Sequence, residues 1–239
     1  MLTIREDYNV AETSKAFSPH LTRQPRAPLT LTDHLQRAPL RCIEAKEHVF
    51  SEGDPKSYVY QVVTGAVCLY KVLPDGRRQV IDFAYCGDII GLGVGETELY
   101  NAQATIATRV RSLPTSALQA IAQQDPGIAM RMCEAMSAEL TAIRDHLVCI
   151  VQRSAIERLV TFLLALSRRN AARNRDPETI ELPMTRTDIG DFLGLTIETV
   201  SRTFSKLKSL RLIEIDQGTT IRIVDMDELT ALVDGKAAA

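Results

Sequence analysis

The stretch from Asp188 to Arg202, D-I-G-D-F-L-G-L-T-I-E-T-V-S-R, constrains the fold of this chain more than any other. A short helical segment within it ends at Gly194, and Thr196 is placed to cap a second helix. Two helices joined by so short a turn form a helix-turn-helix. Apolar residues of the second helix recur at a spacing of three or four and predict one buried face: Ile197, Val200, Phe204 and Leu207.

The opposite face of this second helix carries Glu198, Ser201 and Arg202, whose spacing makes the three side chains project together. Helix-turn-helix proteins that read the major groove place their base-contacting groups in these turns. An arginine fork matches the two guanine acceptors, a glutamate accepts from the cytosine amine, and a serine serves either role. The alternative is a surface helix in which Glu198 and Arg202 form an intrahelical ion pair.

Hydroxyl and ammonium groups surround these three residues and are candidates for holding the phosphate backbone without reading sequence. They are Thr187, Thr196, Thr199, Lys206 and Lys208. The whole chain has a net charge of −2, and from Gln152 onward thirteen basic residues balance thirteen acidic ones. Attraction to nucleic acid must therefore come from local arrangement and not from bulk charge.

The segments around the helix-turn-helix complete a domain that we place at residues 152–239. A broad apolar face predicts a core helix from Ala155 to Arg169. Two β-type runs flank Gln217-Gly218 and predict a hairpin, the wing of a winged helix, followed by a short helix from Met226 to Val233.

The region from Cys42 to Leu113 consists of short β-type runs separated by glycine turns, which predict a small antiparallel barrel or roll. Asp75-Gly76 is the clearest hairpin turn. The glycine run from Gly91 to Gly95 is followed by no G-K-[ST], so a structural role is favoured over a phosphate loop. The chain therefore belongs to the α+β class, with a polar arm at 1–40, a roll at 41–125 and a long helix at 126–151.

The long helix carries apolar residues at alternating spacings of four and three, which is typical of a coiled-coil seam. The seam residues are Cys133, Met136, Leu140, Ile143, Leu147 and Ile150. Two copies of this helix are expected to pair into a homodimer, which would link two reading helices on a palindromic site. The alternative is an amphipathic helix that lies on its own roll.

Several classes of protein are disfavoured by what the sequence lacks. It has no apolar run long enough to span a bilayer and no secretory signal, so a cytoplasmic protein without membrane contact is expected. Five scattered cysteines and four histidines give no C-x-x-C pair and no metal-ligand spacing. No catalytic triad order, carboxylate pair or nucleotide loop indicates an enzyme. The remaining rival is a roll-containing sensor that binds no DNA.

From about Cys42 to Val233 the chain resembles the cyclic-AMP receptor protein and FNR superfamily of bacterial transcription regulators, most of all its FixK and FNR branch. Three stretches carry the resemblance: P-D-G-R-R-Q-V-I-D-F-A-Y-C-G-D-I-I-G-L, D-P-G-I-A-M-R-M and T-R-T-D-I-G-D-F-L-G-L-T-I-E-T-V-S-R. The resemblance implies a jelly-roll (double-stranded β-helix) domain of the cyclic-nucleotide-binding type. It also implies that the E-x-x-S-R residues read a TTGAT-type half-site, and that the protein is an activator of low-oxygen or related metabolic genes.

The resemblance further implies a surface for RNA polymerase, in the hairpin from Asp75 to Arg78 and the loop from Asn170 to Glu178. Asp75, Arg77, Arg173 and Arg175 are the candidate residues.

The departures from the superfamily concern the effector. The places of the cyclic-AMP ligands hold Leu92, Ala102 and Gln103, so a buried phosphate would lack its cation and cyclic AMP is not expected. No cysteine precedes Cys42, and Arg111 stands at the later ligand position, which argues against the iron-sulfur cluster of FNR.

No cofactor is therefore predicted, and three modes of control stay open. The protein is controlled by its abundance, by haem, or by a small organic effector in an apolar pocket between the roll and the long helix. The axial-ligand candidates for haem are His34, His48, Cys68 and Cys86.

Overall fold

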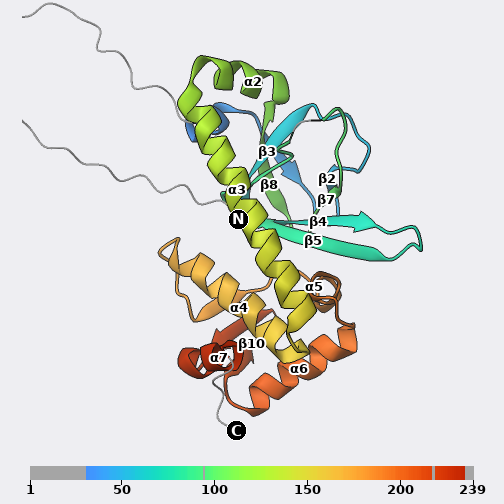
Figure 1. The fold of residues 1–239 in the computed structure, drawn as a ribbon, viewed down its shortest axis with the longest axis vertical. Coiled ribbons are helices and arrows are strands. Elements are labelled where there is room, and N and C mark those ends of the chain that lie inside the picture. Colours follow the sequence, from blue (N-terminus) through green and yellow to red (C-terminus); the bar gives the residue numbers. More distant parts are fainter. Residues whose placement is uncertain (1–30, 94, 217–218, 235–239) are drawn as a thin grey trace, which may run out of the picture.

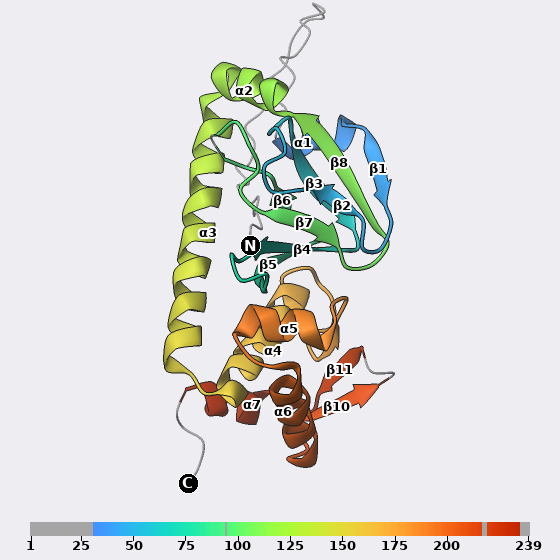
Figure 2. The same ribbon diagram turned by 90° about the vertical axis from the view of Figure 1, so that its right-hand side faces the viewer.

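A computed structural model describes residues 31–93, 95–216 and 219–234 of the chain. Two antiparallel four-stranded sheets form an N-terminal roll, and a long helix runs beside it to a C-terminal domain of helices and a three-stranded sheet (Figures 1 and 2). This is the predicted α+β fold, with its parts in the predicted order. Within the described residues no helix combines the length and the apolar character needed to cross a membrane.

The roll is built from two facing sheets with strand orders β1-β8-β3-β6 and β2-β7-β4-β5. Apolar side chains from both sheets meet in its core, where Val62, Val67 and Ala102 are fully buried. The predicted turn at Asp75-Gly76 joins β4 to β5. The strands are β1 Leu40–Ile43, β2 His48–Phe50, β3 Tyr58–Thr64, β4 Ala66–Val72, β5 Arg78–Tyr85, β6 Ile89–Ile90, β7 Asn101–Ala104 and β8 Thr108–Pro114.

Two short helices, α1 Leu31–Arg37 and α2 Thr115–Gln124, pack at one end of the roll. Leu35 of α1 is fully buried and lies in one apolar cluster with Leu118 and Ile128. Residues 31–37, which we assigned to the N-terminal arm, therefore contribute to the folded core. The rest of that arm, residues 1–30, lies outside the described residues.

Helix α3 Pro126–Gln152 connects the roll to the C-terminal domain and matches the predicted long helix at 126–151. Asp125 caps it by accepting a hydrogen bond from the backbone N–H of Gly127 at 2.8 Å. The predicted break follows, and Ser154 then begins α4 Ala155–Ala171 through a capping box with Glu157.

The C-terminal domain is a winged helix-turn-helix, as predicted. Its elements are β9 Thr179–Glu181, α5 Arg186–Leu193, α6 Ile197–Ser209, β10 Ile213–Asp216, β11 Thr220–Ile223 and α7 Met226–Val233. Strand β9 pairs with β11 and was not predicted, because three residues are too few to show an alternating pattern. The predicted wing turn at residues 217–218 lies outside the described residues.

The roll and the C-terminal domain share one apolar core, to which β4 and β5 contribute Cys68, Val80 and Phe83. The ring of Phe83 lies 5.5 Å from that of Phe192 in α5, which also contacts Phe162 of α4 at 5.7 Å. The two domains therefore meet through a packed interface as well as through α3.

Candidate DNA-binding interface

The turn between α5 and α6 is fixed by close backbone packing. Gly194 ends α5 in the left-handed conformation, with φ 64° and ψ 40°, which glycine adopts without strain. The N–H of Leu195 donates to the carbonyl of Gly190 at 2.9 Å, and a Cβ at Gly190 would lie 2.7 Å from the carbonyl oxygen of Leu195. Thr196 caps α6 by accepting from the N–H of Thr199 at 3.2 Å, as predicted.

Helix α6 buries Val200, Phe204 and Leu207 as predicted, but Ile197 is 44% exposed. The prediction for Ile197 was wrong because this residue begins the helix, where α5 approaches it through the backbone near Gly190 and not through an apolar side chain. The apolar face of α6 thus starts one turn later than the spacing suggested.

The predicted reading residues Glu198, Ser201 and Arg202 are all exposed on α6. Hydrogen bonds from the backbone N–H of Glu198 and from the Thr196 hydroxyl lower the pKa of the Glu198 carboxyl, which keeps it an ionised acceptor. Among the ion pairs of the described residues none joins Glu198 to Arg202, and the Arg202 guanidinium lies 3.4 Å from the Thr199 hydroxyl instead. The three side chains are therefore exposed, and no ion pair holds Glu198 and Arg202 to each other.

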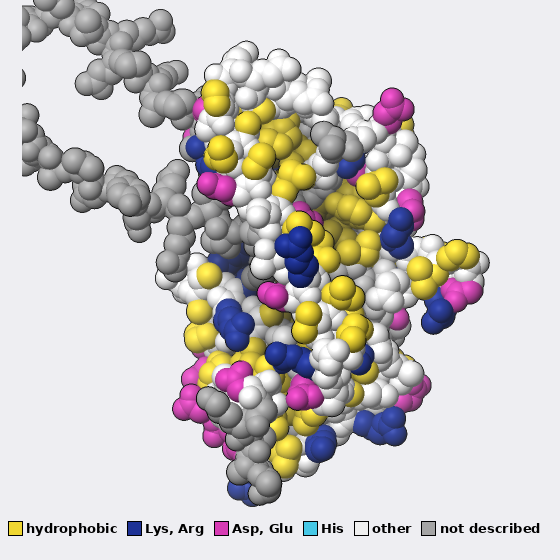
Figure 3. Space-filling view, viewed as in Figure 1, with side chains coloured by type: hydrophobic (Ala, Val, Ile, Leu, Met, Phe, Trp, Pro, Cys, Tyr) yellow, Lys and Arg dark blue, Asp and Glu magenta, His cyan; other side chains and the backbone are white. Residues whose placement is uncertain are grey.

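The candidate backbone contacts lie at the ends of the two helices. Thr187 is exposed in the first turn of α5, Thr196 is exposed at the cap of α6, and Thr199 is half-buried in the first turn of α6. Lys206 and Lys208 are exposed in the last turn of α6. Figure 3 shows Lys and Arg side chains at the lower end of the molecule, where α6 lies.

Arg186 holds α5 against α6 and was not among the predicted residues. Its guanidinium lies 3.4 Å from the ring centre of Phe204, a cation–π contact, and burial lowers its pKa. The arginine at the start of α5 and the aromatic residue in α6 were visible in the sequence, but their contact depends on the angle between the helices. Arg186 therefore contacts α6 on its buried face, opposite the exposed Glu198, Ser201 and Arg202.

Helix α3 both packs on its own chain and exposes the predicted seam. Met136, Leu140, Ile143 and Leu147 are 46%, 47%, 52% and 61% exposed, Cys133 is also exposed, and Ile150 is half-buried. Hydrophobic side chains come to the surface along the course of α3 (Figure 3). The face that packs on the chain includes the buried Ile128 and Cys149, and the His146 ring stacks on Phe192 with centroids 4.1 Å apart.

The candidate polymerase residues differ in their surroundings. Asp75 and Arg77 pair with each other at 2.7 Å in the exposed turn of the β4–β5 hairpin, and Arg175 is exposed after α4. Arg173 was expected in an exposed loop, but its guanidinium points to Asp88 of the roll at 3.6 Å. The expected exposure of Arg173 was therefore wrong, because its guanidinium forms an ion pair with Asp88 at the interface between the two domains.

A cavity lies between β5, β6 and α3, where we expected an apolar pocket. Its lining includes apolar residues such as Leu92 together with Tyr100 and three carboxylates, Asp82, Asp88 and Glu139. The pocket is thus partly acidic, which the sequence did not indicate, since these three residues come from separate elements.

Three residues at the expected cyclic-AMP and iron-sulfur ligand positions, and one candidate haem ligand, make structural contacts or are buried in the roll. Ala102 is fully buried in β7, and the Gln103 amide donates to the carbonyl of Lys46 at 2.8 Å. The Arg111 guanidinium donates to the carbonyl of Ala38 at 2.9 Å. The His48 ring lies 2.8 Å from the Tyr70 hydroxyl.

The other haem-ligand candidates are spread over the roll: His34 and Cys86 are half-buried, and Cys68 is buried. Among the described residues, no group of three or more His, Cys, Asp or Glu side chains is arranged to hold a metal ion.

A jelly roll, a long helix and a winged helix-turn-helix whose second helix exposes polar and charged side chains together form the architecture of a DNA-binding transcription regulator. Two family models match the chain, that of the cyclic nucleotide-binding domain at residues 40–125 and that of the Crp-like helix-turn-helix domain at residues 157–232.

Known regulators are similar over most of the chain. The nitrogen fixation regulation protein FixK of Bradyrhizobium diazoefficiens is 40% identical over 186 residues, 78% of each chain. The transcriptional activatory protein AadR of Rhodopseudomonas palustris is 37% identical over 84% of this chain and 82% of its own. The structure of FixK2 from Bradyrhizobium japonicum is 38% identical with a TM-score of 0.77, and the match covers 84% of this chain and 98% of that one. The chain belongs to the CRP/FNR superfamily, in its FixK-like branch.

Proposed function

We propose that this regulator binds a palindromic TTGAT-type site as a homodimer and activates genes of low-oxygen or related metabolism. The observation that carries the proposal is the shared exposure of Glu198, Ser201 and Arg202 on α6. Their chemistry suits base edges, because arginine offers a fork to guanine and glutamate accepts from cytosine. The similar proteins named as activators support the direction of regulation.

Binding to a labelled palindrome with two TTGAT-type half-sites tests the site. We expect the dimer to bind it at least a thousandfold more tightly than random DNA, as specific regulators do. A duplex with one half-site scrambled is the matched control and should bind much more weakly, because only one reading helix is then engaged. Equal affinity for all three duplexes would reject the proposal.

Dimerisation through α3 is supported by the exposed apolar residues of its seam. Met136, Leu140, Ile143 and Leu147 leave apolar area in water that a second copy of the helix would cover. Replacing Leu140 and Ile143 by glutamate together should give a monomer by analytical ultracentrifugation that binds a single half-site weakly. A double variant that still dimerises would place the interface elsewhere.

Activation requires a surface for RNA polymerase, and the exposed residues Asp75, Arg77 and Arg175 form the revised candidate set. Their alanine variants should bind DNA as the parent chain does and activate transcription less in a purified system. Unchanged transcription from all three would remove this surface.

The proposed location is the cytoplasm, and the proposed control is by abundance, without a cofactor. The second candidate is control by a small effector, which the cavity beside α3 favours, and its carboxylates Asp82, Asp88 and Glu139 would suit a polar or cationic compound. Haem would require an axial ligand among His34, His48, Cys68 and Cys86. Visible absorbance of the purified protein tests haem and iron-sulfur clusters directly, and a metabolite that changes DNA affinity would favour the effector.

A further inference from the structure

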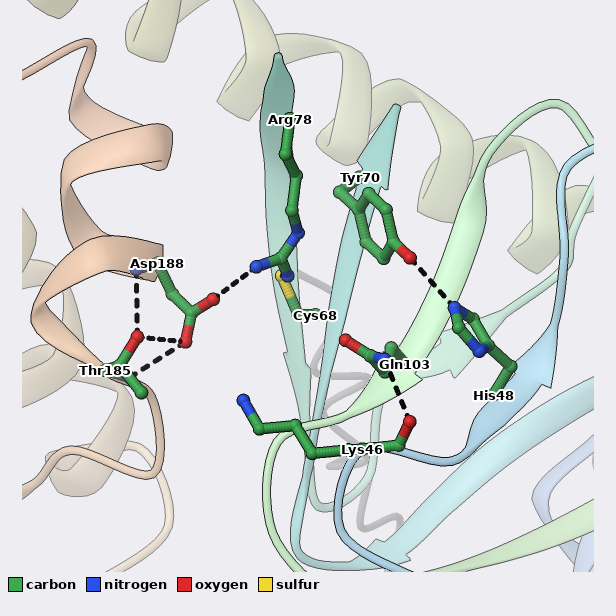
Figure 4. A network of polar contacts seen from close by, with 8 residues as sticks. All are labelled: Lys46, His48, Cys68, Tyr70, Arg78, Gln103, Thr185 and Asp188. Carbon is green, nitrogen blue, oxygen red and sulfur yellow. Dashed lines mark hydrogen bonds and ion pairs between the residues drawn. The ribbon is translucent and has the colours of Figure 1, made fainter. Parts of the chain in front are cut away.

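Arg78 of the roll forms an ion pair with the first helix of the helix-turn-helix. Arg78, the first residue of β5, donates from Nη1 to Oδ1 of Asp188 in α5 at 2.6 Å (Figure 4). The other oxygen of Asp188 completes the capping box of α5, accepting from the Thr185 N–H at 2.9 Å and hydroxyl at 2.7 Å. One carboxylate therefore both starts α5 and ties it to the roll.

The surroundings of Arg78 hold its guanidinium in place. It lies 4.3 Å from the ring centre of Tyr70, and its Nη2 donates to the Cys68 sulfur at 2.9 Å. Burial raises the pKa of the Cys68 thiol to about 12, so the sulfur stays uncharged and Asp188 remains the anion that Arg78 faces. Next to this contact the amide of Gln79 donates to the Asp191 carbonyl of α5 at 2.6 Å.

A second contact of opposite polarity lies elsewhere on the same interface. There the roll supplies the carboxylate, Asp88, and the C-terminal domain supplies Arg169 of α4, with both side chains buried. The packed rings of Phe83, Phe162 and Phe192 belong to the same interface. Two separate ion pairs oppose rotation of one domain against the other, which a single contact would allow.

We propose that Arg78 is a positioning residue for DNA binding: by holding Asp188 at the start of α5, it fixes the orientation in which α6 presents its reading face. This inference rests on the proposed function. A restraint on α5 also acts on α6, because the turn that joins them is closely packed. The N–H of Leu195 donates to the Gly190 carbonyl, and the Leu195 carbonyl leaves no room for a Cβ at Gly190. Two reading helices of a dimer engage a palindrome together only when both domains are held at the correct angle and separation.

The proposal makes Arg78 act on the fraction of protein that is competent to bind. If that fraction falls from near one to about one tenth, the apparent dissociation constant rises about tenfold. We therefore expect Arg78→Ala to weaken binding to the palindrome about tenfold. Binding to random DNA, which does not require two fixed reading helices, should change less than threefold.

The experiment compares Arg78→Ala, Arg78→Lys and Lys71→Ala in the full chain, at a temperature well below the melting transition of each. Lys71 is the matched control, because it is also a cation of the roll, but its partner at 3.0 Å, Glu52, belongs to the roll and not to the C-terminal domain. Lysine at position 78 should restore part of the affinity by keeping the charge, and Lys71→Ala should leave affinity unchanged. Amide exchange across residues 185–193 should quicken in Arg78→Ala only.

Asp188→Asn completes a double-mutant cycle. If Arg78 acts through Asp188, adding Arg78→Ala to Asp188→Asn should cause little further loss of affinity. Fully additive losses would show that Arg78 acts by another route and would overturn the proposal.

Three other results would also overturn it. The first is palindrome binding by Arg78→Ala at the affinity of the parent chain. The second is a lower melting temperature with unchanged affinity of the folded protein, which would make the contact purely stabilising. The third is equal loss on random DNA with a smaller salt slope, which would mean that Arg78 touches phosphate. Failure of the parent chain to bind any palindrome would instead reject the proposed function.

Discussion

Replacing Arg202 by alanine tests the reading face most directly. The structure indicates that this change should not disturb the fold, because the side chain is exposed and its hydrogen bond to the Thr199 hydroxyl is long at 3.4 Å. No ion pair within the described residues involves Arg202, so this side chain need not give up an ion pair when it binds DNA. The loss of affinity should therefore report the contact with the base.

The expected magnitude follows from the geometry of the arginine fork. A bidentate contact to guanine contributes about 1–3 kcal/mol of discrimination, and a dimer makes it twice on a palindrome. Arg202→Ala should thus cost about 2–6 kcal/mol, or roughly 30-fold to 20,000-fold in affinity. The loss on random DNA should be small, since no guanine in a fixed register is lost there.

Fluorescence anisotropy with three duplexes separates base reading from general attraction. The three duplexes are the palindrome, a variant in which the G·C pair of each half-site is replaced by A·T, and random DNA. The parent chain should bind the palindrome more tightly than the A·T variant, whereas Arg202→Ala should bind these two with equal affinity. Arg168→Ala is the matched control, because Arg168 is an exposed arginine of α4 in the same domain. Equal loss by Arg202→Ala on all three duplexes would refute the reasoning.

Three further predictions concern the seam, the turn and the domain junction. Mild oxidation should cross-link the proposed dimer through Cys133, which is exposed on the predicted seam, and Cys133→Ser should abolish the dimer band on a non-reducing gel. Gly190→Ala should lower the free energy of unfolding by about 1–3 kcal/mol in a denaturant titration, because its Cβ would lie 2.7 Å from the Leu195 carbonyl. Burial lowers the pKa of His146 despite its hydrogen bond to the Phe192 carbonyl, so stability should decline as pH falls through about 6.5, and His146→Phe should flatten this decline.

The order of elements could be predicted because each has a local signal. Pro126 follows a capping aspartate, Gly194 ends α5 and Thr196 starts α6, and each of these signals acts within a few residues. The shared exposure of Glu198, Ser201 and Arg202 could also be predicted, because residues at i, i+3 and i+4 lie on one side of a helix. Ile197 was wrongly predicted to be buried, because the spacing of apolar residues in one helix does not show which of them a neighbouring helix covers.

The contacts between the domains could not be predicted, because the residues that form them are far apart in the chain. Arg78 and Asp188 are 110 positions apart, and Asp88 and Arg169 are 81 apart. Nothing in the local sequence distinguishes Arg78 from Arg77, although one holds α5 and the other pairs with Asp75 in a surface turn. Which of two adjacent arginines meets a carboxylate depends on how the strand is turned toward the other domain.

The balance of charge in the C-terminal domain hides a local excess of cations at α6. Many of its carboxylates are held by the fold: Glu157, Asp188 and Asp225 cap helices, Asp176 accepts hydrogen bonds in the loop before β9, and Glu214 pairs with Arg222. By contrast, no ion pair of the described residues involves Arg202, Lys206 or Lys208. A phosphate near α6 therefore meets exposed positive charge even though the domain as a whole is neutral. Within α6 only Glu198 opposes that attraction, and a base amine that donates to its carboxylate would explain its place on this face.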